Sequence, residues 1–202
     1  MKFPRCSGVL LRFTSLPGRF GIGDLDPSAY EFADFLFAAG QKLWQVLPLN
    51  ATGYADSPYQ CFSAFAGNPM LLSLECLRER GLLQESDLDQ PPPFSEDIVD
   101  YASIVDFRME ALLRAAGVLF ADGSRVDRAA FDHFCESSSA WLDDYALMTC
   151  KDAHHGMMWT LWDRRLRRRD PQAVNEWSTR LAPELKTYKY CSSNSFSSGN
   201  IS

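Results

Sequence analysis

The sequence has no apolar run near the ~20 residues that a helix needs to span a bilayer. Its first six residues, MKFPRC, are too short and too polar for the apolar segment of a secretion signal. Basic residues are outnumbered, with 20 Lys and Arg against 26 Asp and Glu and a net charge of -6. A protein that binds a polyanion needs the opposite balance. We therefore expect no membrane partner, no nucleic-acid partner and a cytoplasmic location.

Metal-ligating patterns are also missing. The six cysteines are spread from Cys6 to Cys191 with no CxxC pair, and there are only three histidines. Zinc ribbons and fingers need cysteines two to four positions apart, so no metal site is expected and the cysteines are predicted to be free thiols. The glycine-rich stretch Phe20–Leu25 lacks the third glycine of GxGxxG, because Asp26 stands in its place. This excludes the usual dinucleotide-binding loop.

Hydrophobic residues make up 46% of the chain and aromatic residues 13%, enough for one sizeable domain or for one domain carrying a small subdomain. The apolar run 8–13 predicts a buried strand, and the run 43–49 predicts a second. Between them, Asp26 can cap a helix, Pro27 suits its first turn and Gly40 can end it. A strand, a helix and a strand in this order predict a parallel βαβ unit with a right-handed crossover.

The remainder of the chain has a different pattern. Residues 69–74 could form a short strand, 75–80 a helix ended by Gly81, and 84–100 an acidic linker around three prolines. Helices are predicted over 107–116, 127–151, 157–169 and 171–188. The last eleven residues hold six serines and no charge, which predicts a disordered tail. We divide the chain into 1–74 with the two strands, a mainly helical subdomain 75–191 and the tail 192–202.

The best candidate site directly follows the second predicted strand. Ligands of parallel α/β folds bind beyond the carboxyl ends of the strands, where this loop belongs. The loop carries aromatic, hydroxyl, amide and carboxylate side chains, namely Asn50, Tyr54, Asp56, Ser57, Tyr59 and Gln60. Pyranose rings lie on aromatic faces while their hydroxyls bind amides and carboxylates, so the loop is a candidate sugar-binding surface. An ordered loop whose tyrosines merely cover the sheet is the alternative.

Several blocks of the sequence resemble the amino-terminal part of the 4-alpha-glucanotransferase family, also called amylomaltase or disproportionating enzyme. The blocks occur in the family's order: SGVLL from Ser7, TSLPG from Thr14, FGIGDL from Phe20, WQVLPL from Trp44, TGY from Thr52, DSPYQ from Asp56 and FSAFAGNP from Phe62. Weaker similarity continues from Trp141 to Tyr190.

The resemblance implies a (β/α)8 TIM barrel of which this chain holds the first βαβ unit, with a mainly helical insertion subdomain. It implies transfer of α-1,4-glucan segments between maltooligosaccharides by a retaining mechanism, in starch and glycogen metabolism, with no metal and no organic cofactor. The matching substrate-binding positions are Tyr54, Ser57 and Tyr59, with Asp56 beside them. The resemblance implies that Ser57 and Tyr59 lie near the cleavage site and Tyr54 nearer an accessory glucan site.

The resemblance also implies what this stretch lacks. The family is well over twice as long, and its three catalytic carboxylates follow later barrel strands, so we expect no catalytic residue before residue 202. Asp132 in AFDHF echoes the family's nucleophile segment, but Ala130 replaces the arginine found there, so we interpret Asp132 as an ordinary helix residue.

We expect this chain to lack transferase activity on its own and to fold poorly around residues 8–49, because an open barrel leaves strand edges unpaired. A non-catalytic α-glucan-binding fragment and a helical protein-interaction module built on residues 105–190 stay open as alternatives. The oligomeric state cannot be read from the sequence.

Overall fold

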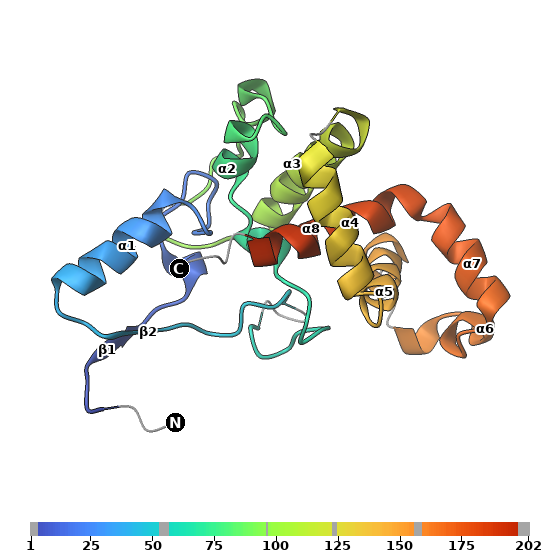
Figure 1. The fold of residues 1–202 in the computed structure, drawn as a ribbon, viewed down its shortest axis with the longest axis horizontal. Coiled ribbons are helices and arrows are strands. Elements are labelled where there is room, and N and C mark those ends of the chain that lie inside the picture. The colour runs from blue at the N-terminus through green and yellow to red at the C-terminus, as the bar shows by residue number, and fades with distance from the viewer. Residues whose placement is uncertain (1–3, 53–56, 96, 123–124, 156–158, 198–202) are drawn as a thin grey trace.

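The computed structural model describes residues 4–52, 57–95, 97–122, 125–155 and 159–197 (Figure 1). Their elements are β1 (Gly8–Leu10), η1 (Phe13–Ser15), α1 (Pro27–Ala38), β2 (Leu43–Gln45), η3 (Pro69–Leu71), α2 (Leu74–Glu79), η4 (Glu85–Asp87), α3 (Tyr101–Asp122), α4 (Arg125–Ser137), α5 (Leu142–His155), η5 (Trp159–Leu161), α6 (Arg164–Arg167), α7 (Pro171–Arg180) and α8 (Ala182–Ser197). No described helix has the length and apolar character required to cross a membrane.

The amino-terminal part forms the predicted βαβ unit. β1 and β2 pair in parallel, with Gly8 opposite Leu43 and Leu10 opposite Gln45. The Asp26 side chain accepts a hydrogen bond from Ser28 N at 2.8 Å, which caps α1 ahead of Pro27. Gly40 has a φ of 73° and follows the helix in a Schellman motif, closed by a bond from Gln41 N to Leu36 O.

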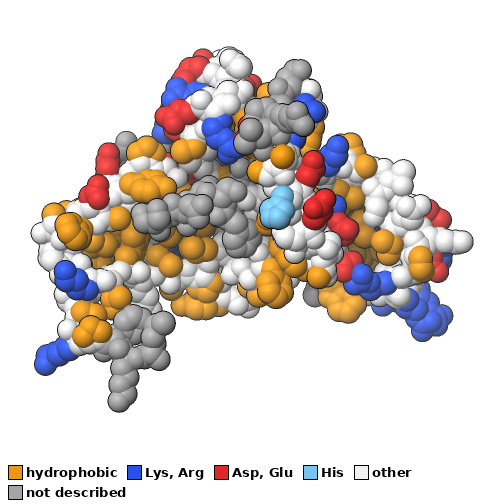
Figure 2. Space-filling view, in the orientation of Figure 1, with side chains coloured by type: hydrophobic (Ala, Val, Ile, Leu, Met, Phe, Trp, Pro, Cys, Tyr) orange, Lys and Arg blue, Asp and Glu red, His pale blue; other side chains and the backbone are white. Residues whose placement is uncertain are grey.

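The prediction that both strands are buried is wrong. Each strand has only three residues, and Leu10 on β1 is 56% exposed. α1 leaves further rings in solvent on the same side of the molecule, and Figure 2 shows hydrophobic side chains over this region. A parallel sheet is normally covered on both faces and paired along its strands. Within the described residues the sheet contains two strands. Trp44 of β2 packs on Phe13 and Phe32, at 4.6 and 5.0 Å between ring centres, while outward residues such as Leu10 stay largely in solvent.

The main core belongs to the helical part, and α8 runs through its centre (Figure 1). One face of α3 is fully buried against α2, the following loop and Tyr190 and Cys191 of α8. Phe20, from the loop after β1, joins the same core and stacks on Phe107 of α3 at 5.8 Å. A second cluster packs α5, α6, α7 and α8 together. Residues 1–74 and the helical subdomain therefore share a core.

A buried ion pair ties the same loop to the helices. Arg108 of α3 is fully buried and donates to Asp24 Oδ2 at 2.7 Å and to the carbonyl oxygen of Leu72. Burial raises the pKa of Asp24 to about 6, and the charge of Arg108 opposes that rise. Asp24 Oδ1 and two nitrogens of Arg108 have no hydrogen-bond partner among the described residues, so the pair is incompletely satisfied.

Several predicted element boundaries are wrong. Residues 69–71 form a 3-10 helix where we expected a strand, because Asn68 caps this turn by accepting from Met70 N at 3.0 Å. α3 passes through Gly117 and ends at Asp122. The helix predicted over 127–151 is divided into α4 and α5 by residues 138–141, and the one over 171–188 is divided into α7 and α8 at Leu181. In the helix predicted over 157–169, the described residues hold only η5 and α6.

The serine-rich end also differs from the prediction. Residues 192–197, assigned to a disordered tail, continue α8. Ser192 and Ser193 are buried, and Ser193 Oγ donates to the carbonyl oxygen of Tyr190 at 2.8 Å. Packing of this turn against neighbouring helices outweighs the weak helix propensity of serine. Residues 198–202 lie outside the described part of the chain.

Candidate functional site

The loop predicted to bind sugar is closed at its base by antiparallel bridges. Asn50 pairs with Gly67, and Thr52 pairs with Cys61. Asn50 Nδ2 also donates to the carbonyl oxygen of Ala66 at 3.2 Å, and Asn68 N donates to Leu49 O at 3.1 Å. Residues 66–74 are buried or nearly so, so the returning arm is anchored in the core while residues 57–65 project from it.

Two of the four predicted substrate-binding residues can be placed. Ser57 is half-buried, and its carbonyl oxygen accepts from Gln60 N at 3.1 Å in a tight turn. Its Oγ accepts from Tyr59 N at 3.4 Å. The Tyr59 side chain is 72% exposed, so its ring is available to a ligand. Tyr54 and Asp56 lie outside the described residues.

The same loop exposes two aromatic residues that the sequence analysis did not assign to the site. Phe62 is 54% exposed and Phe65 is 62% exposed. The Phe65 ring lies 5.9 Å from the ring of Trp141, just ahead of α5, with an interplanar angle of 31°. One sequence signal could have identified Phe62 and Phe65. They follow Tyr59 at three-residue spacings in a stretch without charged residues.

Two hollows lie near the carboxyl ends of the strands. A small one of about 20 Å³, room for about one water molecule, sits between the loops that follow β1 and β2. Arg12, Thr14, Leu49, Thr52 and Asn68 are among its lining residues. A larger one of about 910 Å³ lies between the loop after β1 and the linker, lined by Ser15, Arg19, Asp26, Phe94 and Asp97 among others.

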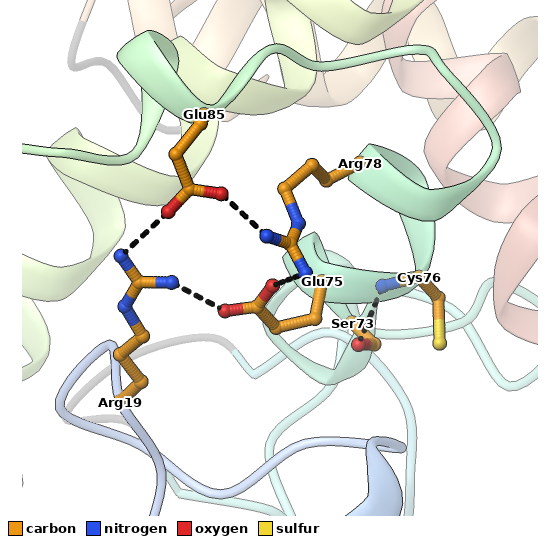
Figure 3. A network of polar contacts seen from close by, with 6 residues as sticks. All are labelled: Arg19, Ser73, Glu75, Cys76, Arg78 and Glu85. Carbon is orange, nitrogen blue, oxygen red and sulfur yellow. Dashed lines mark hydrogen bonds and ion pairs between the residues drawn. The ribbon is translucent and has the colours of Figure 1, made fainter.

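A cluster of two acidic residues, Glu75 and Glu85, lies elsewhere and is paired with arginines. In Figure 3, Arg19 and Arg78 each face both Glu75 and Glu85. Arg19 contacts the two carboxylates at 2.7 and 3.2 Å, and Arg78 contacts Glu75 at 2.9 Å. The hydrogen bond from Arg78 holds the pKa of Glu85 below its usual range. A general acid needs a raised pKa, so this network is a poor acid–base pair for catalysis.

Other acidic residues are no better placed for chemistry. Asp24 has a raised pKa, but its side chain is enclosed and paired with Arg108. Asp132 lies exposed on α4, in the ordinary helical setting we expected. Within the described ranges, no group of three or more His, Cys, Asp and Glu side chains could hold a metal ion.

Comparisons with known proteins agree with the sequence resemblance. The profile of the family described as 4-alpha-glucanotransferase matches residues 11–198. A 4-alpha-glucanotransferase of Synechocystis is 45% identical over 187 residues, covering 92% of this chain and 37% of the relative. One from Thermus thermophilus is 44% identical over 191 residues, covering 94% of this chain and 37% of the relative.

A solved structure shows the same arrangement of elements. Amylomaltase from Streptococcus agalactiae in complex with acarbose matches with a TM-score of 0.89 and 31% identity. The match covers 96% of this chain and 39% of the amylomaltase chain. The chain thus spans between a third and two fifths of the length of these three proteins.

Proposed function

This chain belongs to the 4-alpha-glucanotransferase family, and we propose that it supplies the opening strands and a glucan-binding loop of such an enzyme. The enzyme would move α-1,4-glucan segments from one maltooligosaccharide to another. The proposal rests on one observation: the exposed Tyr59 and the half-buried Ser57 lie on a loop anchored beyond the carboxyl end of β2. Ligand sites of parallel α/β folds occupy this position.

The barrel itself is part of the proposal. β1 and β2 would be two strands of a (β/α)8 barrel, with α1 as the helix between them and the region 75–191 as a helical insertion. The exposed apolar residues of the sheet and α1, such as Leu10 and Phe37, support this because further barrel strands and helices would cover them.

The reaction would be a retaining double displacement. One carboxylate attacks the anomeric carbon while a second carboxylic acid protonates the departing glycosidic oxygen, and the glycosyl-enzyme is then passed to a sugar hydroxyl. We propose that Ser57 and Tyr59 position the glucan and that no carboxylate of this chain performs these steps. The arginine partners of Glu75 and Glu85 and the enclosure of Asp24 support that division of roles.

Incubation with maltotriose tests the catalytic part of this proposal. We expect the purified chain to release no glucose and to form no longer oligomer, because the resemblance places the three catalytic carboxylates of the family after later barrel strands than β1 and β2. Chromatography of the products would detect transfer. Clear turnover would place catalytic carboxylates within this chain and contradict the proposal.

Titration with maltoheptaose tests the binding part. We expect saturable binding that Tyr59→Ala weakens, since that variant removes the most exposed ring among the described residues of the loop. Absence of measurable binding would contradict a glucan-binding role for this chain.

A further inference from the structure

Phe62 and Phe65 are left in solvent although the loop around them is well ordered by hydrogen bonds. Burying a phenylalanine side chain stabilises a protein by roughly 1.5–3 kcal/mol, so two exposed rings in one loop forgo a substantial gain. Both flank Ser63, whose Oγ accepts from Phe65 N and Ala66 N at 3.1 Å each. Because Ala66 is fully buried, this turn joins the exposed rings directly to the core.

Trp141 supports Phe65 from the helical subdomain. Besides its contact with Phe65, the Trp141 ring lies against Tyr145 at 6.0 Å and Phe134 at 6.3 Å. Trp141 is therefore held by α4 and α5, and Phe65 rests on it with most of its surface still exposed. Contact with Trp141 therefore holds the Phe65 ring in one orientation while most of its surface stays exposed. A fixed, exposed ring suits recognition of a rigid ligand.

The chemistry of the loop favours an uncharged, hydroxyl-rich ligand. Residues 57–68 carry no acidic or basic side chain, while Ser57, Gln60 and Ser63 alternate with the aromatic residues. A phosphate-bearing ligand or an anionic membrane surface would call for Lys or Arg here. A pyranose ring offers an apolar face to an aromatic ring and hydroxyls to amide and hydroxyl groups.

We propose that Phe62 and Phe65 extend the glucan-binding surface that begins at Tyr59, and that Trp141 is a positioning residue for Phe65. The occupant is an α-1,4-glucan chain long enough to reach more than one of these rings. This inference rests on the proposed function, because it assigns further contacts to the same site.

The test compares variants of this chain in titrations with maltotriose and maltoheptaose. Phe62→Ala and Phe65→Ala are each expected to weaken maltoheptaose binding by about three- to tenfold, the range for loss of one aromatic contact, and to affect maltotriose less. Phe65→Tyr, which keeps the ring, should bind normally, and Phe65→Leu should not. Phe37→Ala is the matched control, because this ring of α1 is 79% exposed and lies outside the loop.

The results separate the two proposals. If Tyr59→Ala weakens binding and the two phenylalanine variants do not, the extended surface is wrong while the glucan-binding loop stands. If the unaltered chain binds neither sugar, both proposals fail. If Phe37→Ala weakens maltoheptaose binding as much as Phe65→Ala does, the inference is also overturned. The effect would then not be specific to the rings of the loop.

The role of Trp141 is tested by a double-mutant cycle. Trp141→Leu should weaken maltoheptaose binding about as much as Phe65→Ala, and combining the two changes should add little, because Trp141 acts through Phe65. Thermal unfolding of each variant checks that the fold is retained. Fully additive losses would show that Trp141 does not act by positioning Phe65.

Discussion

At the scale of single residues, the buried pair Asp24–Arg108 links the loop after β1 to α3 and yields the clearest stability prediction. Removing one partner of a buried ion pair leaves the other charge without compensation, which typically costs about 3–5 kcal/mol. We therefore expect Arg108→Met to destabilise the chain by that amount at pH 7. Asp24→Leu combined with Arg108→Met should recover most of the loss, as measured by urea unfolding. Additive destabilisation in the double variant would contradict this account.

The same pair predicts a pH dependence. Burial raises the pKa of Asp24 from 3.8 in the unfolded chain to about 6 in the folded one, so the folded state binds this proton more tightly. The contribution of Asp24 to the free energy of unfolding is therefore largest at low pH and is lost as the pH rises toward 6.

Comparison with Asp24→Asn, which cannot titrate, isolates this effect. The free energy of unfolding of the unaltered chain, relative to that of the variant, should be about 2 kcal/mol larger at pH 4.5 than at pH 7, so the chain is more stable at the lower pH. Urea unfolding at the two pH values measures it. A relative stability that is constant, or that rises toward pH 7, would show that Asp24 does not have a raised pKa.

The sequence alone identifies part of the candidate site at this scale. Ser57 and Tyr59 stand out because hydroxyl and aromatic residues directly follow a predicted strand. The pairing of Asp24 with Arg108 and of Phe65 with Trp141 joins residues more than seventy positions apart. Neither contact has a local sequence signal, since tertiary packing alone brings these side chains together.

At the scale of elements, two glycines should respond oppositely to the same substitution. Gly117 lies exposed in the middle of α3, and a Cβ there would meet no atom within 4 Å. Gly117→Ala should therefore stabilise the chain by about 1 kcal/mol, the difference in helix propensity. Gly40 also has open space around it, but its φ of 73° makes Gly40→Ala unfavourable by about 1–2 kcal/mol. Thermal unfolding of both variants checks the signs, and equal shifts would contradict the prediction.

Elements with a clear start and stop are predictable, and divided helices are not. α1 has Asp26, Pro27 and Gly40 as local signals, and the structure confirms it. The break between α4 and α5 covers residues 138–141. Just ahead of it, Ser137 Oγ donates to the carbonyl oxygen of Phe134 at 3.0 Å and so competes with the helix. Pro183 marks the start of α8, because proline cannot continue a preceding helix. The apolar periodicity continues across the α4–α5 and α7–α8 boundaries, so the sequence pattern does not reveal them.

At the scale of the whole molecule, the shared core argues against an independent helical module. Phe20, Ile22 and Asp24, all from the loop after β1, are buried against α3 or the segments beside it. Deleting residues 1–60 should therefore lower the melting temperature by at least about 10 °C and expose apolar surface to a hydrophobic dye. Deleting residues 1–5, of which Pro4 and Arg5 are exposed, is the control. Retention of the full melting temperature after the longer deletion would revive the helical-module alternative.

The central place of α8 also sets an order of events during synthesis. Tyr190 and Cys191 complete the core formed by α3, although about eighty residues separate them along the chain. Translation proceeds from the amino terminus, so α2 and α3 leave the ribosome with one apolar side still open. That apolar side is covered only after residues 190–193 have emerged. Until then the nascent polypeptide exposes apolar surface of the kind that chaperones bind.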